Sequence, residues 1–214
     1  MRPPNARYLI LIFLSFSYFS LAQAETYALI ADRLIDGKSN DALQNKAVIV
    51  SGTQITAITD ITRIPKDAIR VNLPGTTLMP GMINAHEHPL LYKSDYQNAH
   101  LQGSSAYKAL LGLSNLQRLL KAGWTTIRVM GDGDVYYANQ DIRKAIDAGI
   151  FIGPRLTGAA HYISITGGGG DINYFSPEQK VLADGLIADG PEEIRKAIRK
   201  EIKYGSDWIK IMVT

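Results

Sequence analysis

This sequence predicts an α/β fold, with a small antiparallel β segment first and alternating strands and helices after it. The 214 residues are 46% hydrophobic and 20% charged, which is ordinary for a globular protein. Short strand-like runs fill the stretch from Tyr27 to Met79, whereas helical periodicity begins only after Pro89. Strands separated by helices favour βα units and a parallel sheet.

Residues 1–24 have the pattern of a secretory signal peptide. Arg2 and Arg7 make the N-terminus positive, and the apolar run Tyr8–Leu21 ends before the small-x-small triplet Ala22–Ala24. The run is shorter than the roughly 20 residues that span a bilayer. We therefore expect cleavage rather than a stable membrane anchor, a mature chain that starts at Glu25, and a periplasmic or secreted protein.

The overall composition excludes several kinds of site. The formal net charge is only +3, so nothing indicates binding to nucleic acid or to an anionic surface. The chain has no cysteine, which excludes disulfides, thiolate zinc sites and a cysteine nucleophile.

The segment 25–79 alternates strand-like runs with turn signals such as Asp36-Gly37, Ser51-Gly52 and Pro74-Gly75. A small antiparallel β-sandwich is the expected structure, and so few residues would bury little surface by themselves. The expected strands are 27–35, 47–50, 54–58, 69–73 and 76–79.

The segment 80–214 is expected to form four βα units. Apolar stripes predict helices over 104–121 and 137–148, and a proline followed by acidic residues starts a last helix near Pro191. That helix is expected to bury Ile194, Ala197, Ile198 and Ile202, and its many charges, Glu201 among them, to face solvent. The expected strands are 82–88, 125–130, 155–159 and 208–213.

The first of these strands ends in two histidines, His86 and His88. Side chains alternate between faces along a strand, so both imidazoles should point the same way and Glu87 the opposite way. Two adjacent imidazoles can chelate one metal ion, most often zinc. The alternative is that two of the four histidines fall together in a loop by chance.

Lys210 lies in the last strand, between Ile209 and Ile211, on the same face as Trp208 and Met212. A buried, unpaired ammonium group is costly and tends to lose its charge. The alternative is a lysine that reaches water from a strand edge. His100 and His161 have no partner at ligand spacing, so we expect both at surface or loop positions. The glycine-rich loop Thr166–Asp171 lacks the Gly-Lys-Ser/Thr ending of a phosphate-binding loop.

The stretch from Pro80 to His88 resembles the first barrel strand of the amidohydrolase superfamily, and Ser206–Thr214 resembles the fourth, whose lysine is carboxylated by CO2. Further stretches resemble the branch of Xaa-Pro and Xaa-Arg/Lys dipeptidases near imidazolonepropionase. They are 122–128, 153–156, 164–168 and 187–193. The chain departs from that branch at Gly169, where a histidine is frequent, and at Val129, where aspartate is usual.

The resemblance implies an incomplete (β/α)8 TIM-type barrel of about four βα units, corresponding to the N-terminal half of the family fold. It also implies a site in which His86 and His88 hold one Zn²⁺ and a CO2-derived carbamate on Lys210 bridges two. Gly167, Gly168, Gly169, Gly170 and Asp171 would form a substrate loop. The remaining ligands and the catalytic aspartate are expected beyond Thr214, so no catalytic residue is assigned within the chain.

Two hypotheses follow for the function. The chain is the N-terminal part of a zinc-dependent hydrolase of dipeptide-like C–N bonds, inactive by itself, or it is a non-catalytic remnant or interaction module. A cyclic-amide hydrolase of the imidazolonepropionase type is a further alternative. The expected partners are a small peptide or cyclic amide and, in a homo-oligomer, a second copy of the chain.

Overall fold

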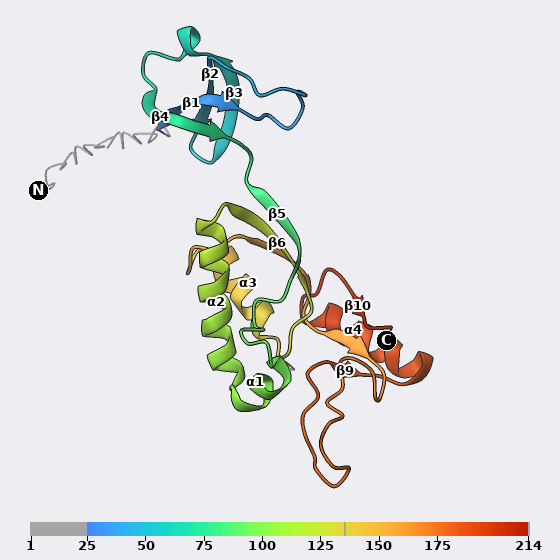
Figure 1. Cartoon of the computed structure of the whole chain (residues 1–214). Coiled ribbons are helices and arrows are strands. Elements are labelled where there is room, and N and C mark those ends of the chain that lie inside the picture. The colour runs from blue at the N-terminus through green and yellow to red at the C-terminus, as the bar shows by residue number, and fades with distance from the viewer. Residues whose placement is uncertain (1–24, 135, 214) are drawn as a thin grey trace, which may run out of the picture. The chain divides into compact units, whose positions relative to one another are not determined.

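The computed structural model describes residues 25–134 and 136–213, which form two compact units, one up to Pro80 and one from Gly81 onward. The predicted signal peptide lies outside the described residues. Within the described ranges, no helix combines the length and the apolar character that crossing a membrane would require. Figure 1 shows strands with one short 3-10 helix in the first unit, and mixed helices and strands in the second.

The first unit is one four-stranded sheet with the order β3-β2-β1-β4. Neighbours β1, β2 and β3 are antiparallel, but β4 pairs with β1 in parallel. The predicted small antiparallel β-sandwich is therefore confirmed only in its antiparallel β1, β2 and β3, because β4 is parallel to β1 and the described strands of this unit form one sheet. After β3 the chain passes through a short 3-10 helix and returns beside β1 in the same direction. The elements are β1 (Thr26–Leu34), β2 (Lys46–Ser51), β3 (Gln54–Asp60), η1 (Ile61–Arg63) and β4 (Ile69–Leu78).

Strand β4 continues through Pro74-Gly75, where the sequence predicted a turn between two strands. Gly75 has a φ of 75°, and its N–H donates to the Asp32 carboxylate at 3.0 Å. The register between β1 and β4 shifts between Ala31 and Arg33, opposite this point. The glycine therefore makes an irregularity within one strand and does not end it. The buried core of this unit consists of Ala28, Ala47, Ile49 and Ile64.

The second unit contains two parallel three-stranded sheets, in the orders β5-β6-β7 and β10-β8-β9. The predicted helices and the first three predicted strands are present, and α1, β8 and β9 were not predicted. The elements are β5 (Met82–Glu87), α1 (Tyr96–Gln102), α2 (Ser105–Lys121), β6 (Trp124–Met130), α3 (Ala138–Asp147), β7 (Arg155–Ala159), β8 (Tyr162–Ser164), β9 (Leu186–Ile187), α4 (Gly190–Lys203) and β10 (Lys210–Ile211).

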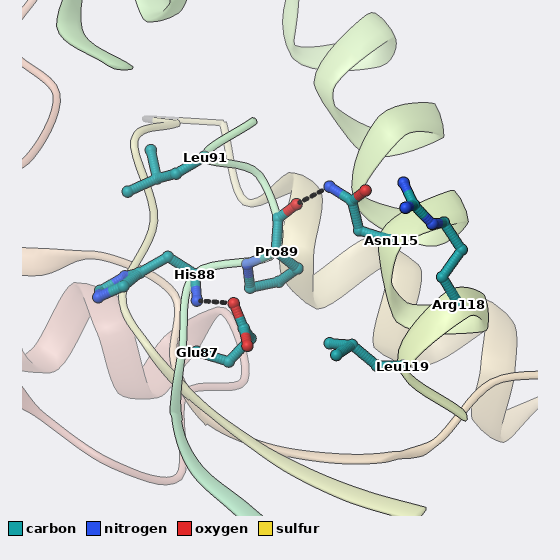
Figure 2. Close-up of a pocket in the computed structure, with 7 residues that line it drawn as sticks. All are labelled: Glu87, His88, Pro89, Leu91, Asn115, Arg118 and Leu119. Atoms are coloured by element: carbon teal, nitrogen blue, oxygen red, sulfur yellow. Dashed lines mark hydrogen bonds between the residues drawn. The ribbon is translucent and has the colours of Figure 1, made fainter. Parts of the chain in front are cut away.

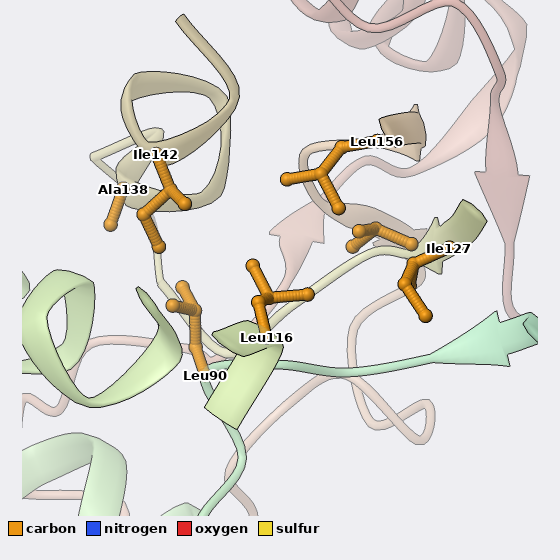
Figure 3. Close-up of a cluster of buried hydrophobic side chains, with 7 residues drawn as sticks. Leu90, Leu116, Ile127, Ala138, Ile142 and Leu156 are labelled. Atoms are coloured by element: carbon orange, nitrogen blue, oxygen red, sulfur yellow. The ribbon is translucent and has the colours of Figure 1, made fainter. Parts of the chain in front are cut away.

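The main core packs α2 and α3 against β6 and β7. Figure 3 shows Leu116 from α2 and Ile142 from α3 gathered with Ile127 from β6 and Leu156 from β7. Replacing such a buried leucine with alanine typically costs about 2–5 kcal/mol of stability. Leu110, also on α2, is by contrast 67% exposed.

The last strand differs most from its prediction. We expected it to follow the first three strands in one sheet, but β10 pairs with β8, with Lys210 opposite Tyr162. Only the segment that leads into β10 reaches β7, where the N–H groups of Asp207 and Trp208 donate to the carbonyl of Gly158. The described residues thus form a mixed α/β fold.

Helix α4 also buries a different set of residues than expected. Ile194, Ala197 and Ile198 are half-buried, whereas Ile202 is 60% exposed. Glu201, predicted to face solvent, is fully buried. Its carboxylate has polar partners on the chain that leads into β8, which makes its burial possible.

Candidate metal centre

His86 and His88 converge at the end of β5. Their Nε2 atoms are 3.1 Å apart, and the two rings meet edge to face with centroids 5.1 Å apart. Two nitrogen ligands of a tetrahedral zinc ion, each at 2.0–2.1 Å, are about 3.3 Å apart. The pair therefore fits two positions of one metal coordination sphere, as the alternation along a strand predicts.

The hydrogen bonds of His88 determine its tautomer. Its Nδ1 lies 2.5 Å from the carbonyl oxygen of Gly131, and because a carbonyl can only accept, Nδ1 carries the proton. The lone pair is then on Nε2, which faces His86. Burial lowers the pKa of His88 and outweighs the Gly131 hydrogen bond, which raises it. A neutral imidazole with a free Nε2 is the form that binds a metal.

Glu87 points to the other face of β5, as predicted. Its carboxylate accepts hydrogen bonds from the Asn84 side chain and from the N–H of His88, at 2.7 and 3.1 Å. Figure 2 shows the ring of His88 pointing away from Asn115 and Arg118 of α2. Glu87 therefore lines another hollow, beside α2, and does not point to where a metal ion bound by the histidine pair would lie.

Lys210 lines the same cavity as His86 and His88. The cavity has a volume of about 390 Å³, and its remaining wall is made by Leu91, Tyr96, Tyr162 and Met212. Lys210 and Met212 share this face, as the strand period predicts. Trp208 does not line the cavity, because its indole N–H donates to Thr157 and the Arg128 guanidinium lies over its ring.

Tyr162 is the part of the cavity wall that sequence reasoning missed. It is 4% exposed and lies in a strand of three residues, too short to show periodicity. A Cβ placed at Gly170 would approach its ring to 3.0 Å, and one at Gly185 would approach it to 2.7 Å. Two glycines therefore allow two backbone segments to pack directly on the ring of Tyr162.

Asp184 lies next to this wall and is fully buried. Neither carboxylate oxygen has a hydrogen-bond partner among the described residues. Burial raises the pKa of Asp184, outweighing the lowering influence of Tyr162 and Gln97. The carboxylate in turn contributes to a raised pKa of Tyr96, second to burial.

The predicted substrate loop does not line the cavity. Its backbone closes on itself through hydrogen bonds from Asp171 to Gly168 and from Gly167 to the Asp171 side chain. Gly170 connects it to the cavity wall by its contact with Tyr162. Gly169 is exposed.

The other two histidines were expected at surface or loop positions, and neither is at the surface: His161 is in a loop but buried, and His100 is in a helix and buried. His100 lies in α1, 6% exposed, with Nδ1 2.8 Å from the Gly133 carbonyl and 2.9 Å from the Lys108 ammonium group. His161 lies between β7 and β8, fully buried, and its Nδ1 donates to Glu201 at 2.7 Å. Polar partners compensate for the burial of both rings at Nδ1, whereas neither Nε2 has a hydrogen-bond partner among the described residues.

Within residues 25–134 and 136–213, no group of three or more His, Cys, Asp or Glu side chains is arranged to hold a metal ion. The donor set at the cavity is two imidazoles and one lysine amine. The imidazole pair has the spacing that a metal requires, His88 has the required tautomer, and the lysine is close enough to the pair to affect the pKa of His88. The residues present therefore fit part of a metal site.

Comparison with known proteins identifies the family. The model of the amidohydrolase family matches residues 77–214, which is most of the chain. The chain belongs to the amidohydrolase family. This match includes β5, with its histidine pair, and β10, with Lys210.

Individual relatives of this amidohydrolase cover most of the chain. The ochratoxinase of Aspergillus niger is 30% identical over 91% of this chain and 43% of its own length. A solved amidohydrolase structure has a TM-score of 0.75 and 26% identity, covering 87% of this chain and 46% of the other. A Xaa-Pro dipeptidase with methionine bound in its active site has a TM-score of 0.71 and 29% identity, covering 87% and 47%. The chain spans less than half the length of each.

Proposed function

We propose that this chain supplies part of the metal centre of a zinc-dependent hydrolase that cleaves C–N bonds in small, dipeptide-like substrates. The observation that carries the proposal is the convergence of the His86 and His88 Nε2 atoms, 3.1 Å apart, in a cavity that Lys210 also lines. Membership of the amidohydrolase family supports it.

The fold proposal accompanies the functional one. The order β5-β6-β7 is parallel, and helices follow β5 and β6, as in the βα units of a (β/α)8 barrel. Functional side chains of such barrels come from the C-terminal ends of strands. His86 and His88 are at that end of β5. We propose that residues 81–214 belong to an incomplete barrel.

The proposed roles of His86 and His88 rest on their geometry, and that of Lys210 rests on the resemblance of its strand to the family. His86 and His88 would donate Nε2 lone pairs to one zinc ion, and Lys210, carboxylated by CO2, would place carbamate oxygens in the same cavity. A bound zinc ion supplies Lewis-acid activation of a carbonyl group and of water. The Gly131 carbonyl holds His88 in the ligand tautomer. Leu91, Tyr96 and Tyr162 form another part of the cavity wall.

A small substrate fits the cavity. The cavity volume of about 390 Å³ is at the lower end of the range for ligand pockets, which measure about 300–1,000 Å³. A dipeptide-like substrate is further supported by the similar structures, which include the Xaa-Pro dipeptidase and a prolidase complexed with N-methylphosphonate-L-proline. We propose that Gly167–Asp171 affects substrate binding through the contact between Gly170 and Tyr162.

The chain contributes too few ligands for a complete site. Structural zinc sites have four ligands, and catalytic ones have three from the protein. Here only the two histidines are ready ligands, because a carbamate on Lys210 would be stable only with metal ions beside it, and His100 and His161 are engaged elsewhere. We propose that the 214-residue chain binds zinc weakly and does not hydrolyse dipeptides.

The decisive experiment measures bound zinc and dipeptide hydrolysis for two proteins side by side. One is the 214-residue chain, and the other is a longer protein that contains this chain and is extended to about the length of the relatives. We expect weak zinc binding without turnover in the first, and two zinc ions with turnover in the second. Lys210→Ala should abolish turnover by the longer protein, and short carboxylic acids should restore part of it. Turnover by the 214-residue chain, or a longer protein indifferent to Lys210→Ala, would contradict the proposal.

The location of the protein follows from residues 1–24. We propose export to the periplasm or the medium with cleavage before Glu25, on the strength of the short apolar run and the Ala22–Ala24 triplet. N-terminal sequencing of exported protein should begin at Glu25. Exported protein that begins at Met1 would contradict this.

A further inference from the structure

The loop Gly131–Asp134, which follows β6, contacts the chain that follows the histidine pair. Asp132 in this loop is fully buried, and both of its carboxylate oxygens are hydrogen-bonded. Oδ1 accepts from the N–H of Leu90 at 3.0 Å, and Oδ2 accepts from the Asn139 side chain at 3.1 Å. Asp132 thus connects the chain after β5 to helix α3.

Leu90 is two residues beyond His88, in a turn. The N–H of Leu91 donates to the His88 carbonyl at 3.0 Å, which closes the turn, and the Leu90 N–H is directed at Asp132. The residue before Asp132, Gly131, accepts the Nδ1 proton of His88. Two neighbouring residues of one loop therefore hold His88 by its ring and by the backbone that follows it.

The position of this loop is itself fixed. Gly131 has a φ of 82°, and a Cβ there would lie 2.5 Å from the backbone nitrogen of Tyr162. The N–H of Asp132 donates to the Ala160 carbonyl at 3.0 Å. The loop is therefore held against the chain between β7 and β8, and cannot move without displacing the Tyr162 side of the cavity.

We infer that Asp132 is a positioning residue for the metal ligand His88, acting through the Leu90 amide and the attached Gly131 carbonyl. The inference rests on the proposed function, because it assumes that His88 binds zinc. Partners in the outer shell of a metal site orient the ligands, and their loss typically weakens metal binding about 10–100-fold. Asp132 would have this effect without contacting the imidazole.

Asp134 provides a matched control in the same loop. It is also buried, but it accepts from Ser105 and from the N–H of Ala138, and it pairs with Lys108 at 3.2 Å. These contacts hold α2 and α3 and do not reach the turn after His88. Replacement of Asp134 should therefore lower stability without a specific effect on the histidine pair.

The experiment measures zinc affinity by chelator competition for the 214-residue chain and its variants, under conditions where each is folded. We expect Asp132→Ala to bind zinc at least about tenfold more weakly. Asp132→Asn should retain most of the affinity, because an amide oxygen can still accept from Leu90. Asp134→Ala should bind zinc as the unaltered chain does. Nitrogen NMR of the metal-free imidazoles should show the Nδ1-protonated tautomer of His88 in the unaltered chain and a mixture in Asp132→Ala.

Each outcome of this experiment either supports or overturns the positioning role of Asp132. If the unaltered chain binds no zinc, the proposed function and this inference fail together. If it binds zinc, and Asp132→Ala binds it equally well or Asp134→Ala loses as much, only the positioning role is overturned. Should Asp132→Ala not fold, Asn139→Ala removes one partner of Asp132 and should weaken zinc binding about threefold to tenfold. Unchanged zinc affinity in that variant overturns the inference.

Discussion

Two regions of the chain place histidines in contrasting surroundings. One is the end of β5, and the other is the contact between α4 and the residues just before β8. At the first, His86 and His88 face each other, and the Nδ1 of His88 donates to a neutral carbonyl. At the second, His161 is fully buried and donates to the carboxylate of Glu201, which also accepts from the His161 N–H and from Ser206. In both regions one ring has a protonated Nδ1, that of His88 and that of His161, but the first region borders a cavity, whereas His161 is fully buried.

The difference shows that burial and fixed tautomer alone do not identify a metal ligand. A carboxylate partner and complete burial make His161 a structural contact between α4 and the sheet. Burial tends to raise the pKa of Glu201, but its hydrogen bonds and the charge of His161 outweigh this and lower it. The histidine pair, by contrast, directs two Nε2 atoms at one point beside open space. Four predictions test this contrast, from the largest expected effect to the smallest.

His88→Ala should abolish zinc binding by the 214-residue chain, because a single imidazole and a lysine amine remain. The free energy of unfolding of the metal-free chain should change little, since the ring is only half-buried. Isothermal titration calorimetry and urea denaturation measure the two quantities. Zinc binding that persists in both His88→Ala and His86→Ala would place the metal elsewhere.

Glu201→Ala should lower the free energy of unfolding by about 3–5 kcal/mol, because removing one partner leaves the other buried without compensation. The matched control is Glu192→Ala on the same helix, where the carboxylate is 81% exposed and paired with Arg195. That change should hardly shift the urea midpoint, as is usual for surface pairs. Equal effects of the two substitutions would show that the buried contact has no special role.

Gly185→Ala should destabilise the chain by about 1–3 kcal/mol through overpacking. Its new methyl group would lie 2.7 Å from the Tyr162 ring and 2.8 Å from the Tyr162 carbonyl oxygen. Gly169→Ala is the control, because Gly169 is exposed and is not among the glycines with positive φ. Urea denaturation gives the stability, and the aromatic NMR signals of Tyr162 should shift only in Gly185→Ala. Unshifted signals there would argue against a close-packed wall.

Asp184→Asn should raise the thermal midpoint at pH 7 by about 2–4 °C, equivalent to about 1 kcal/mol. The pKa of Asp184 is raised in the folded protein, so the carboxyl stabilises the fold when protonated and loses that contribution as the pH rises through its folded pKa. The advantage of the Asp184→Asn variant should therefore vanish as the pH falls below the ordinary carboxyl pKa of 3.8. A midpoint that falls at pH 7 would indicate that Asp184 has a partner that compensates for its burial.

Local periodicity predicted the parts of the fold and site that depend on neighbouring residues. Period 2 placed His86 and His88 on one face, and placed Lys210 with Met212. Helices α2 and α3 followed from apolar spacing, and α4 followed from the proline and acidic residues at its start. Strands β8, β9 and β10 have only two or three residues each, so the pairing of β10 with β8 left no periodic signal.

The burial of Glu201 shows that the spacing along a helix can place a residue on the buried face even though its residue type argues for exposure. Position 201 is seven, four and three residues after Ile194, Ala197 and Ile198, so it lies on the buried face of α4. Its charge argued for solvent exposure, and the compensating partner, His161, is forty residues away in sequence. Only the folded chain brings them together. The buried positions of His100 and His161 were missed for the same reason.

Strand β5 lies at an edge of its sheet, and this has a consequence for solution measurements. Ile83 on this strand is 67% exposed, and within the described residues β5 pairs only with β6. An edge strand readily accepts another strand. A second copy that paired there would order the same backbone that carries His86 and His88. Self-association and zinc binding would then be thermodynamically linked, so the apparent zinc affinity would depend on protein concentration.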